Sequence, residues 1–321
     1  MTALGHATTL AVTRGVRASA SIVAVTRELA IELPGLSVGA LAWGPDDGPL
    51  ALLLHGFPDT AWSWRVVGPA LAADGWRVVA PFARGYAPTE RARDGSYQVG
   101  ALVHDVVDLH RTLDGDAGAL LVGHDWGAIT AYGVASFAPQ LFGRVVAMSV
   151  PPVATMQRVV RGRLALRQLR NSWYILANQV PGLAESAFEP LVRKLWADWS
   201  PGYDATEELA HLLEALPDRA RRTAAIRYYR ALVRPWSRRA EYADAQNAWL
   251  RTPSVPMLYL HGAQDGCLLP AVGAEAAADL PTGSRAVLIP GAGHFLQLEQ
   301  PDAVAGEIRR FVPAPTKGTA L

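Results

Sequence analysis

The chain of 321 residues contains a single cysteine, Cys267, so it cannot form an internal disulfide. This scarcity agrees with a reducing compartment, and we expect a cytoplasmic location. No apolar stretch approaches the roughly 20 residues that a membrane span needs. The formal net charge of +1 gives no electrostatic reason to expect binding to nucleic acid or to an acidic polymer. We therefore expect a globular protein with no membrane span and no nucleic-acid partner.

Motifs for metals and phosphates are also missing. No cluster of His, Cys, Asp or Glu in the sequence has the spacing of metal ligands, and no Gly-rich phosphate loop is present. We therefore expect neither a metal nor a cofactor. The sequence does contain a basic, partly amphipathic run, which we interpret as a solvated face, with contact to a membrane surface as the alternative. Its members are Arg158, Arg161, Arg163, Arg167 and Arg170.

The order of strand-like and helix-like segments indicates an α/β fold. Half of the residues are hydrophobic, which is enough for one large α/β domain with an insertion. Helical patterns fill the gaps between strands, for example at 98–113 and 301–311. Strands that alternate with helices predict a mostly parallel sheet covered on both faces. The predicted strands are 27–32 and 36–43, which form a hairpin, and 50–54, 76–82, 119–122, 144–150, 255–260 and 285–289.

This alternation stops between 152 and 250, a region rich in Arg, Leu, Trp and Tyr. We interpret 152–250 as a helical cap inserted after the sixth predicted strand, over the carboxyl ends of the sheet, where ligands bind in such folds. The α/β core then comprises 28–151 and 251–313. We interpret 1–27 as a disordered extension, with a transit peptide as the alternative, and 314–321 as a flexible tail.

The pentapeptide Gly123-His124-Asp125-Trp126-Gly127 follows one of the predicted strands and precedes a helical pattern. Small residues at its two ends let a strand turn sharply into a helix with residue 125 at the tip, which is the geometry of a nucleophile elbow. An Asp there has an unperturbed pKa of about 3.9, so it needs no base to activate it. Such a carboxylate can attack carbon and form an ester on the enzyme. A helix-capping Asp, the alternative, leaves the flanking glycines unexplained.

Four further motifs accompany the elbow: His55-Gly56-Phe57-Pro58 with Ser63-Trp64-Arg65, then Arg84-Gly85-Tyr86, His261-Gly262-Ala263-Gln264-Asp265 and Gly293-His294-Phe295. In this order, and spanning 30–313, the set resembles the α/β-hydrolase superfamily and, within it, the epoxide hydrolases with an Asp nucleophile. The resemblance implies the α/β-hydrolase fold. It also implies that the substrates are a small apolar epoxide and water, and that the product is a vicinal diol released from an alkyl ester on Asp125.

The predicted catalytic triad is completed by His294 and Asp265. His294 follows the last predicted strand, which fits the chain order of nucleophile, acid and histidine, and it is the predicted general base on water. Asp265 is predicted to accept a hydrogen bond from the imidazole and fix its tautomer, although Asp265-Gly266 is also a turn dipeptide. Some relatives carry the acid after the sixth strand, but 149–152 contains no carboxylate, which favours Asp265.

The cap is expected to supply the acid for the leaving group. An opened epoxide departs as an alkoxide, and a tyrosine with a pKa of about 10 can protonate it. In epoxide hydrolases a pair of cap tyrosines has this role, and Tyr174 and Tyr229 occupy the similar positions here. Tyr228 is an alternative to Tyr229. The chain departs from the family at Asn178, where an aromatic residue is usual, which affects the expected shape of the pocket.

The backbone N–H groups of Phe57 and Trp126 are the predicted oxyanion hole. The same positions bear on the alternative function, a dehalogenase with the same Asp nucleophile. Haloalkane dehalogenases often carry Asn where this chain has Phe57, and fluoroacetate-type haloacid dehalogenases usually carry Arg where it has Trp126. A second alternative is a non-catalytic binding protein of the same fold, which would have lost a catalytic residue. The particular epoxide, the selectivity and the oligomeric state stay open.

Overall fold

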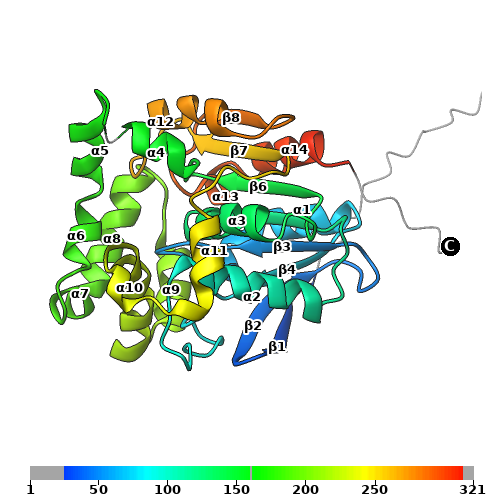
Figure 1. Cartoon of the computed structure of the whole chain (residues 1–321), viewed down its shortest axis with the longest axis horizontal. Helices are drawn as coiled ribbons and strands as arrows, with labels where there is room; N and C mark the ends of the chain where they lie inside the picture. Colours follow the sequence, from blue (N-terminus) through cyan, green and yellow to red (C-terminus); the bar gives the residue numbers. More distant parts are fainter. Residues whose placement is uncertain (1–24, 160, 314–321) are drawn as a thin grey trace, which may run out of the picture.

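The computed structural model describes residues 25–159 and 161–313; the predicted tail, and the predicted extension up to residue 24, lie outside these ranges. An eight-stranded sheet forms the centre, in the order β1-β2-β4-β3-β5-β6-β7-β8 (Figure 1). β2 runs antiparallel to both β1 and β4, whereas all neighbours from β4 to β8 are parallel. The strands are β1 (Arg27–Leu33), β2 (Leu36–Trp43), β3 (Leu50–Leu54), β4 (Arg77–Pro81), β5 (Leu120–His124), β6 (Arg144–Met148), β7 (Met257–Gly262) and β8 (Arg285–Ile289).

Helices cover both faces of this sheet. On one face α2 packs against α3, and on the other α1 packs against α14 (Figure 1). β3, β5 and β7 are buried along their whole length, which is why their sequences are largely apolar. These elements confirm the predicted α/β architecture. The helices of the core are α1 (Val67–Ala73), α2 (Val99–Thr112), α3 (Trp126–Phe137), α12 (Pro270–Glu275), α13 (Leu296–Glu299) and α14 (Pro301–Phe311), with the 3₁₀ helices η1 (Ala61–Trp64) and η4 (Ala276–Asp279).

Between β6 and β7 the described residues form helices and no strand, as the sequence predicts. These helices lie beside one end of the sheet, apart from α11, which packs on α2 and α3 of the core (Figure 1). We call α5 to α10 the cap. The elements are α4 (Val153–Val159), α5 (Ala165–Asn171), α6 (Trp173–Ala177), α7 (Leu183–Ser186), α8 (Phe188–Trp199), α9 (Thr206–Ala215), α10 (Arg219–Val233) and α11 (Ala243–Ala248), with η2 (Pro235–Ser237) and η3 (Ala240–Tyr242).

The predicted bounds of β2, β3 and β8 match the structure. The other five strands differ from the prediction by one or two residues at one or both ends, and two of these differences have a backbone reason. β7 begins at Met257 and not at Val255, because Pro256 has no N–H to donate to the sheet. β6 ends at Met148 because Ser149 has a φ of 66°, which turns the chain out of the strand. In the described part of the chain, no helix is long and apolar enough to cross a bilayer.

Candidate active site

The backbone holds Asp125 in a strained conformation between β5 and α3, with φ 52° and ψ −112°. A non-glycine residue at positive φ is uncommon, and such strain concentrates at functional sites. The turn needs both flanking glycines. A Cβ on Gly123 would lie 2.2 Å from the carbonyl oxygen of Gly127, and a Cβ on Gly127 would lie 2.2 Å from that of Leu54. The elbow therefore has the sharp geometry that its sequence predicts.

The two carboxylate oxygens of Asp125 have different surroundings. The backbone N–H of Phe57 donates a hydrogen bond to Oδ1 at 2.8 Å. Oδ2 lies 3.7 Å from Nε2 of His294. Trp126 is the first residue of α3, so its N–H is among the four that have no acceptor inside the helix. The arrangement leaves Oδ2 free to react while Oδ1 is held by a backbone donor.

His294 lies between two carboxylates and is fully buried. Its Nδ1 is 2.9 Å from Oδ2 of Asp265. Burial lowers the pKa of the imidazole, but the negative charges of Asp265 and Asp125 outweigh burial and raise the pKa to about 10. The other oxygen of Asp265 accepts hydrogen bonds from the N–H groups of Cys267 and Leu268 at 2.8 and 3.0 Å. The three predicted triad residues therefore meet at one point.

Three residues that sequence reasoning missed hold the histidine loop in place, together with His124, a motif histidine expected to support a loop. The hydroxyl of Ser149 donates to the carbonyl oxygen of His294 at 2.6 Å. The backbone N–H of His294 donates to Ser200 Oγ and to the carbonyl oxygen of Trp199, both at 3.0 Å. Nε2 of His124 is 2.9 Å from that same His294 carbonyl oxygen. The only sequence signal for Ser149 was its place at the end of a predicted strand. Trp199, the last residue of α8, and Ser200, which follows it, carried no sequence signal for this role.

Asp125 opens into a cavity of about 200 Å³. Tyr174 on α6 and Tyr229 on α10 both line it, with ring centroids 5.5 Å apart and planes at 87°. The hydroxyl of Tyr229 has no hydrogen-bond partner among the described residues. Burial raises the pKa of both phenols well above its usual value, so both stay protonated at neutral pH. The rest of the lining is largely apolar and includes Ile129, Val150, Pro151, Val153, Met156, Ile175, Leu232, Trp249 and Leu268.

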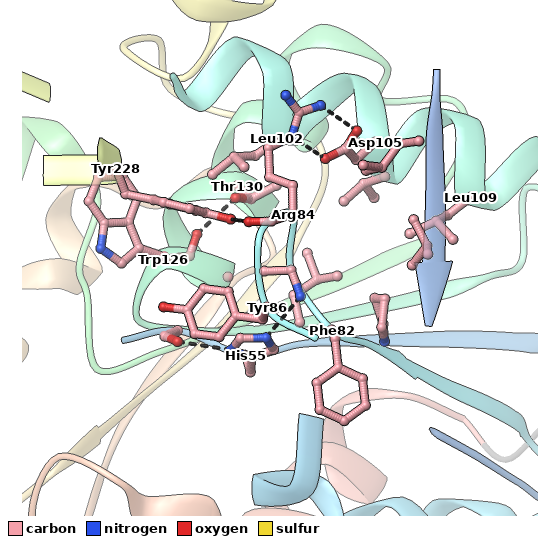
Figure 2. Close-up of a pocket in the computed structure, with 18 residues that line it drawn as sticks. His55, Phe82, Arg84, Tyr86, Leu102, Asp105, Leu109, Trp126, Thr130 and Tyr228 are labelled. Carbon is pink, nitrogen blue, oxygen red and sulfur yellow. Dashed lines mark hydrogen bonds and ion pairs between the residues drawn. The ribbon is translucent and has the colours of Figure 1, made fainter. Parts of the chain in front are cut away.

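Tyr228, the alternative to Tyr229, points elsewhere. Its hydroxyl donates to the carbonyl oxygen of Arg84 at 2.9 Å, and the guanidinium of that arginine pairs with Asp105 (Figure 2). These groups line a second, smaller cavity of about 50 Å³. Trp126 lines both cavities and lies between them. The geometry therefore places Tyr229, and not Tyr228, in the cavity that Asp125 lines.

The single cysteine belongs to the wall of the larger cavity. The Cys267 thiol is buried on the wall of the larger cavity, with Sγ 3.6 Å from the hydroxyl of Tyr174. Burial raises the pKa of the thiol, so it is a neutral lining group and not a nucleophile. Within the described ranges, no three or more His, Cys, Asp or Glu side chains are grouped as metal ligands.

Comparison with known proteins identifies the family of the chain. The family model of the alpha/beta hydrolase fold matches residues 49–301. Epoxide hydrolase A of Mycobacterium tuberculosis is 30% identical over an alignment 319 residues long. The alignment covers 89% of this chain and 97% of that protein. An epoxide hydrolase of Caballeronia sordidicola is 28% identical, with 92% and 96% covered. The crystal structure of Epoxide Hydrolase A from Mycobacterium thermoresistibile has a TM-score of 0.72 at 26% identity, with 91% and 99% covered. The chain belongs to the α/β-hydrolase superfamily and, within it, to the epoxide hydrolase family.

Proposed function

We propose that this enzyme opens epoxides to vicinal diols in two chemical steps, alkylation of Asp125 and hydrolysis of the resulting ester. The observation that carries the proposal is the pair of cap phenols, Tyr174 and Tyr229, in the same apolar cavity as the Asp125 carboxylate. A carboxylate alone can displace many leaving groups. Protonated phenols in the same cavity favour a leaving group that departs as an alkoxide, because they can give it a proton. The relatives named epoxide hydrolases support the same reaction.

In the first step Oδ2 of Asp125 attacks a ring carbon of the epoxide. A C–O bond forms to that carbon, and the ring C–O bond breaks. Phe57 holds Oδ1 through its backbone N–H, so Oδ2 is the oxygen with freedom to attack. The ring oxygen takes a proton from Tyr229 or Tyr174 as it leaves. The predominantly apolar lining excludes water at this stage, which strengthens the hydrogen bonds to the developing alkoxide.

In the second step His294 activates a water molecule. Before alkylation its pKa is raised to about 10, so the imidazole carries a proton at neutral pH. Ester formation removes the negative charge of Asp125, which is one of the two charges that raise this pKa. The imidazole can then lose a proton to solvent and accept one from water through Nε2. Nδ1 keeps its hydrogen bond to Asp265, which fixes the ring.

Water then adds to the carbonyl carbon of the ester. The negative charge develops on Oδ1, which already accepts the Phe57 N–H; the Trp126 N–H is the proposed second donor. The bond between this carbon and Oδ2 breaks, and Oδ2 takes a proton from the imidazolium as it leaves in the diol. The water oxygen stays in Asp125, and the proton still on that oxygen passes to the phenolate formed in the first step. His294 then regains from solvent the proton it had lost. No metal or organic cofactor is needed for this scheme.

A panel of terminal, aryl and fatty epoxides, assayed for diol, tests the proposal, with matched haloalkanes assayed for halide. We expect the parent to form diol and the Asp125→Ala variant to form none. Release of halide without any diol would instead support the dehalogenase alternative, in which the cap donors hold a halide. Absence of both products, from protein that is folded by circular dichroism, would favour the binding-protein alternative.

A further inference from the structure

The outer edge of the cap exposes an unusual concentration of apolar side chains. Six of the twelve exposed large hydrophobic residues of the described chain fall within 166–183. They are spread over three consecutive short helices: Leu166 and Leu169 on α5, Trp173 and Leu176 on α6, Val180 in the turn that follows, and Leu183 at the start of α7. Exposure reaches 85% for Leu166 and 71% for Leu176. The six, which we call the apolar stripe, are Leu166, Leu169, Trp173, Leu176, Val180 and Leu183.

The apolar stripe follows α5, α6 and the start of α7, which succeed one another down the left edge of the molecule in Figure 1. The opposite side of the same helices packs inward. The side-chain amide of Gln168 donates to the carbonyl oxygen of Cys267, and that of Asn171 donates to the carbonyl oxygen of Gly266. The inner surface is therefore occupied by the core, whereas the stripe faces outward.

Positive charge predominates along the chain beside the apolar stripe. Asp198 shares a surface groove with Arg170 and Trp173, but its carboxylate pairs with Lys194 at 2.8 Å. The sequence has no Asp or Glu from residue 151 to residue 184. Arg167 and Arg170 each follow a stripe residue by one position, so helical geometry puts them beside the stripe. Together with Arg161 and Arg163 they are exposed, and none forms an ion pair with another described residue. Some other cap cations do have partners; besides Lys194, Arg193 pairs with Glu189 at 2.8 Å.

We propose that this face of the cap docks on the surface of an anionic phospholipid bilayer. An apolar stripe bordered by arginines is the pattern of a helix that lies in the interface plane, with its apolar side chains among the acyl chains and its cations at the headgroups. A second copy of the chain is a poorer occupant, because a twofold interface brings the same arginines of both copies together. The exposed apolar area and the positive charge of the arginines therefore both fit an anionic bilayer.

Docking in this orientation places the wall of the active-site cavity against the bilayer. On α6, Trp173 and Leu176 face outward, whereas Tyr174 and Ile175 line the cavity. One short helix therefore contacts both the lipid and the substrate site. This part of the inference rests on the proposed function: the arrangement favours turnover of epoxides that partition into membranes. The docking itself does not depend on that function.

Vesicle flotation of the full chain tests the docking, with phosphatidylserine mixed into phosphatidylcholine or with phosphatidylcholine alone. We expect binding to the mixed vesicles that weakens at about 1 M salt, where the Debye length is about 3 Å. The variant R163Q/R167Q/R170Q should lose about fivefold in affinity for each arginine. Its control, R111Q/R285Q/R310Q, makes the same change in charge at exposed positions of the core and should bind as the parent does.

The second variant, L166S/L169S/L176S, removes apolar area and keeps every charge. It should also weaken binding to mixed vesicles, and because these side chains are exposed its thermal unfolding should match the parent's. Equal binding by the parent and both variants, or no binding by the parent, would overturn the proposal. Self-association of the parent in sedimentation, lost in L166S/L169S/L176S, with no vesicle binding, would assign the stripe to a second copy.

The docking and the proposed function can fail separately. Flotation uses no substrate, so a protein that binds mixed vesicles but makes no diol would contradict only the function. If both hold, the two triple variants should keep the parent rate on a small water-soluble epoxide. They should lose rate on a fatty epoxide presented in mixed vesicles. An equal rate on the vesicle-borne epoxide would show that docking does not serve substrate uptake.

Discussion

Oδ2 of Asp125 lies 3.7 Å from Nε2 of His294, beyond hydrogen-bond distance. The carboxylate and the imidazole face each other without a hydrogen bond between them, although both are buried. Asp125 therefore keeps one oxygen available for attack, and the imidazole keeps one nitrogen available for water. This separation underlies the proposed division of labour, in which the carboxylate makes the ester and the histidine serves its hydrolysis.

The first prediction concerns the source of the diol oxygen. Because Oδ2 leaves with the product, a single turnover in oxygen-18 water should give a diol whose new oxygen is unlabelled. The label should appear in the peptide that carries Asp125, and mass spectrometry of both species measures it. Solvent label in the diol of the first turnover would mean that water attacks the epoxide directly.

The second prediction separates the two steps at His294. His294→Gln removes the base for water but leaves the nucleophile and the cap donors in place. We expect a substrate adduct to accumulate on the peptide that carries Asp125, seen by mass spectrometry. Asp125→Ala is the control and should form no adduct. Full turnover by the His294 variant would assign water activation to another group.

The third prediction concerns the cap phenols. Tyr174→Phe and Tyr229→Phe should each slow ester formation, since the remaining phenol can still donate. The double variant should lose most of the contribution of general acid catalysis, about 10²–10⁴-fold. Ester hydrolysis should be unchanged, and rapid-mixing kinetics with a chromogenic epoxide resolves the two steps.

Tyr228→Phe is the matched control for the cap phenols. It removes a neighbouring hydroxyl of the same helix that donates to Arg84 and does not face Asp125. Its rate of ester formation should stay near the parent value. If the double variant opened epoxides at the parent rate, Tyr174 and Tyr229 would only pack, and the dehalogenase alternative would gain support.

The fourth prediction is a loss of stability with rising pH. The folded-state pKa of His294 is raised from 6.5 to about 10. A raised pKa stabilises the fold fully below about pH 6.5, and the contribution is lost as pH rises toward 10. For one proton the slope is at most about 1.4 kcal/mol per pH unit. Urea unfolding of the parent should therefore show declining stability between about pH 7 and 10.

His294→Gln should flatten this decline, because it removes the titrating group. Other buried groups change the stability of the fold in other pH ranges. Burial lowers the pKa of His55 and His261, so their contributions change below about pH 6.5, and burial raises the pKa of the buried tyrosines such as Tyr259, which matter above about pH 10. An identical pH slope for parent and variant would show that His294 is not protonated in the resting enzyme.

The fifth prediction tests the elbow backbone. Gly127→Ala places a Cβ 2.2 Å from the carbonyl oxygen of Leu54, so the turn must shift and both stability and activity should fall. Gly306→Ala is the control inside α14, where the added Cβ meets only the far end of Arg310 at 3.9 Å. That change should stabilise the protein by about 0.5–1 kcal/mol. Thermal unfolding and diol formation measure both variants, and a Gly127 variant with parent stability would contradict the close packing of the elbow.

The sequence alone determined the features that depend on local chemistry. The strands β2, β3 and β8 have the predicted ends because apolar runs bounded by turn residues identify strands without tertiary information. The elbow was predictable because only glycines fit at positions 123 and 127. The order of Asp125, Asp265 and His294, together with the motifs that resemble the epoxide hydrolases, led us to expect a triad. Each of the three follows the end of a strand, and parallel strands end at the same edge of the sheet.

Only the tertiary structure decided features that depend on which surfaces meet. Tyr228 and Tyr229 are adjacent in sequence, but one residue along a helix turns a side chain by about 100°, so they face different cavities. Ser149 and Ser200 are distant in sequence, and both bond the backbone of His294 only because β6 and the end of α8 meet there. Such contacts join segments that carry no local signal for each other, so packing alone brings them together.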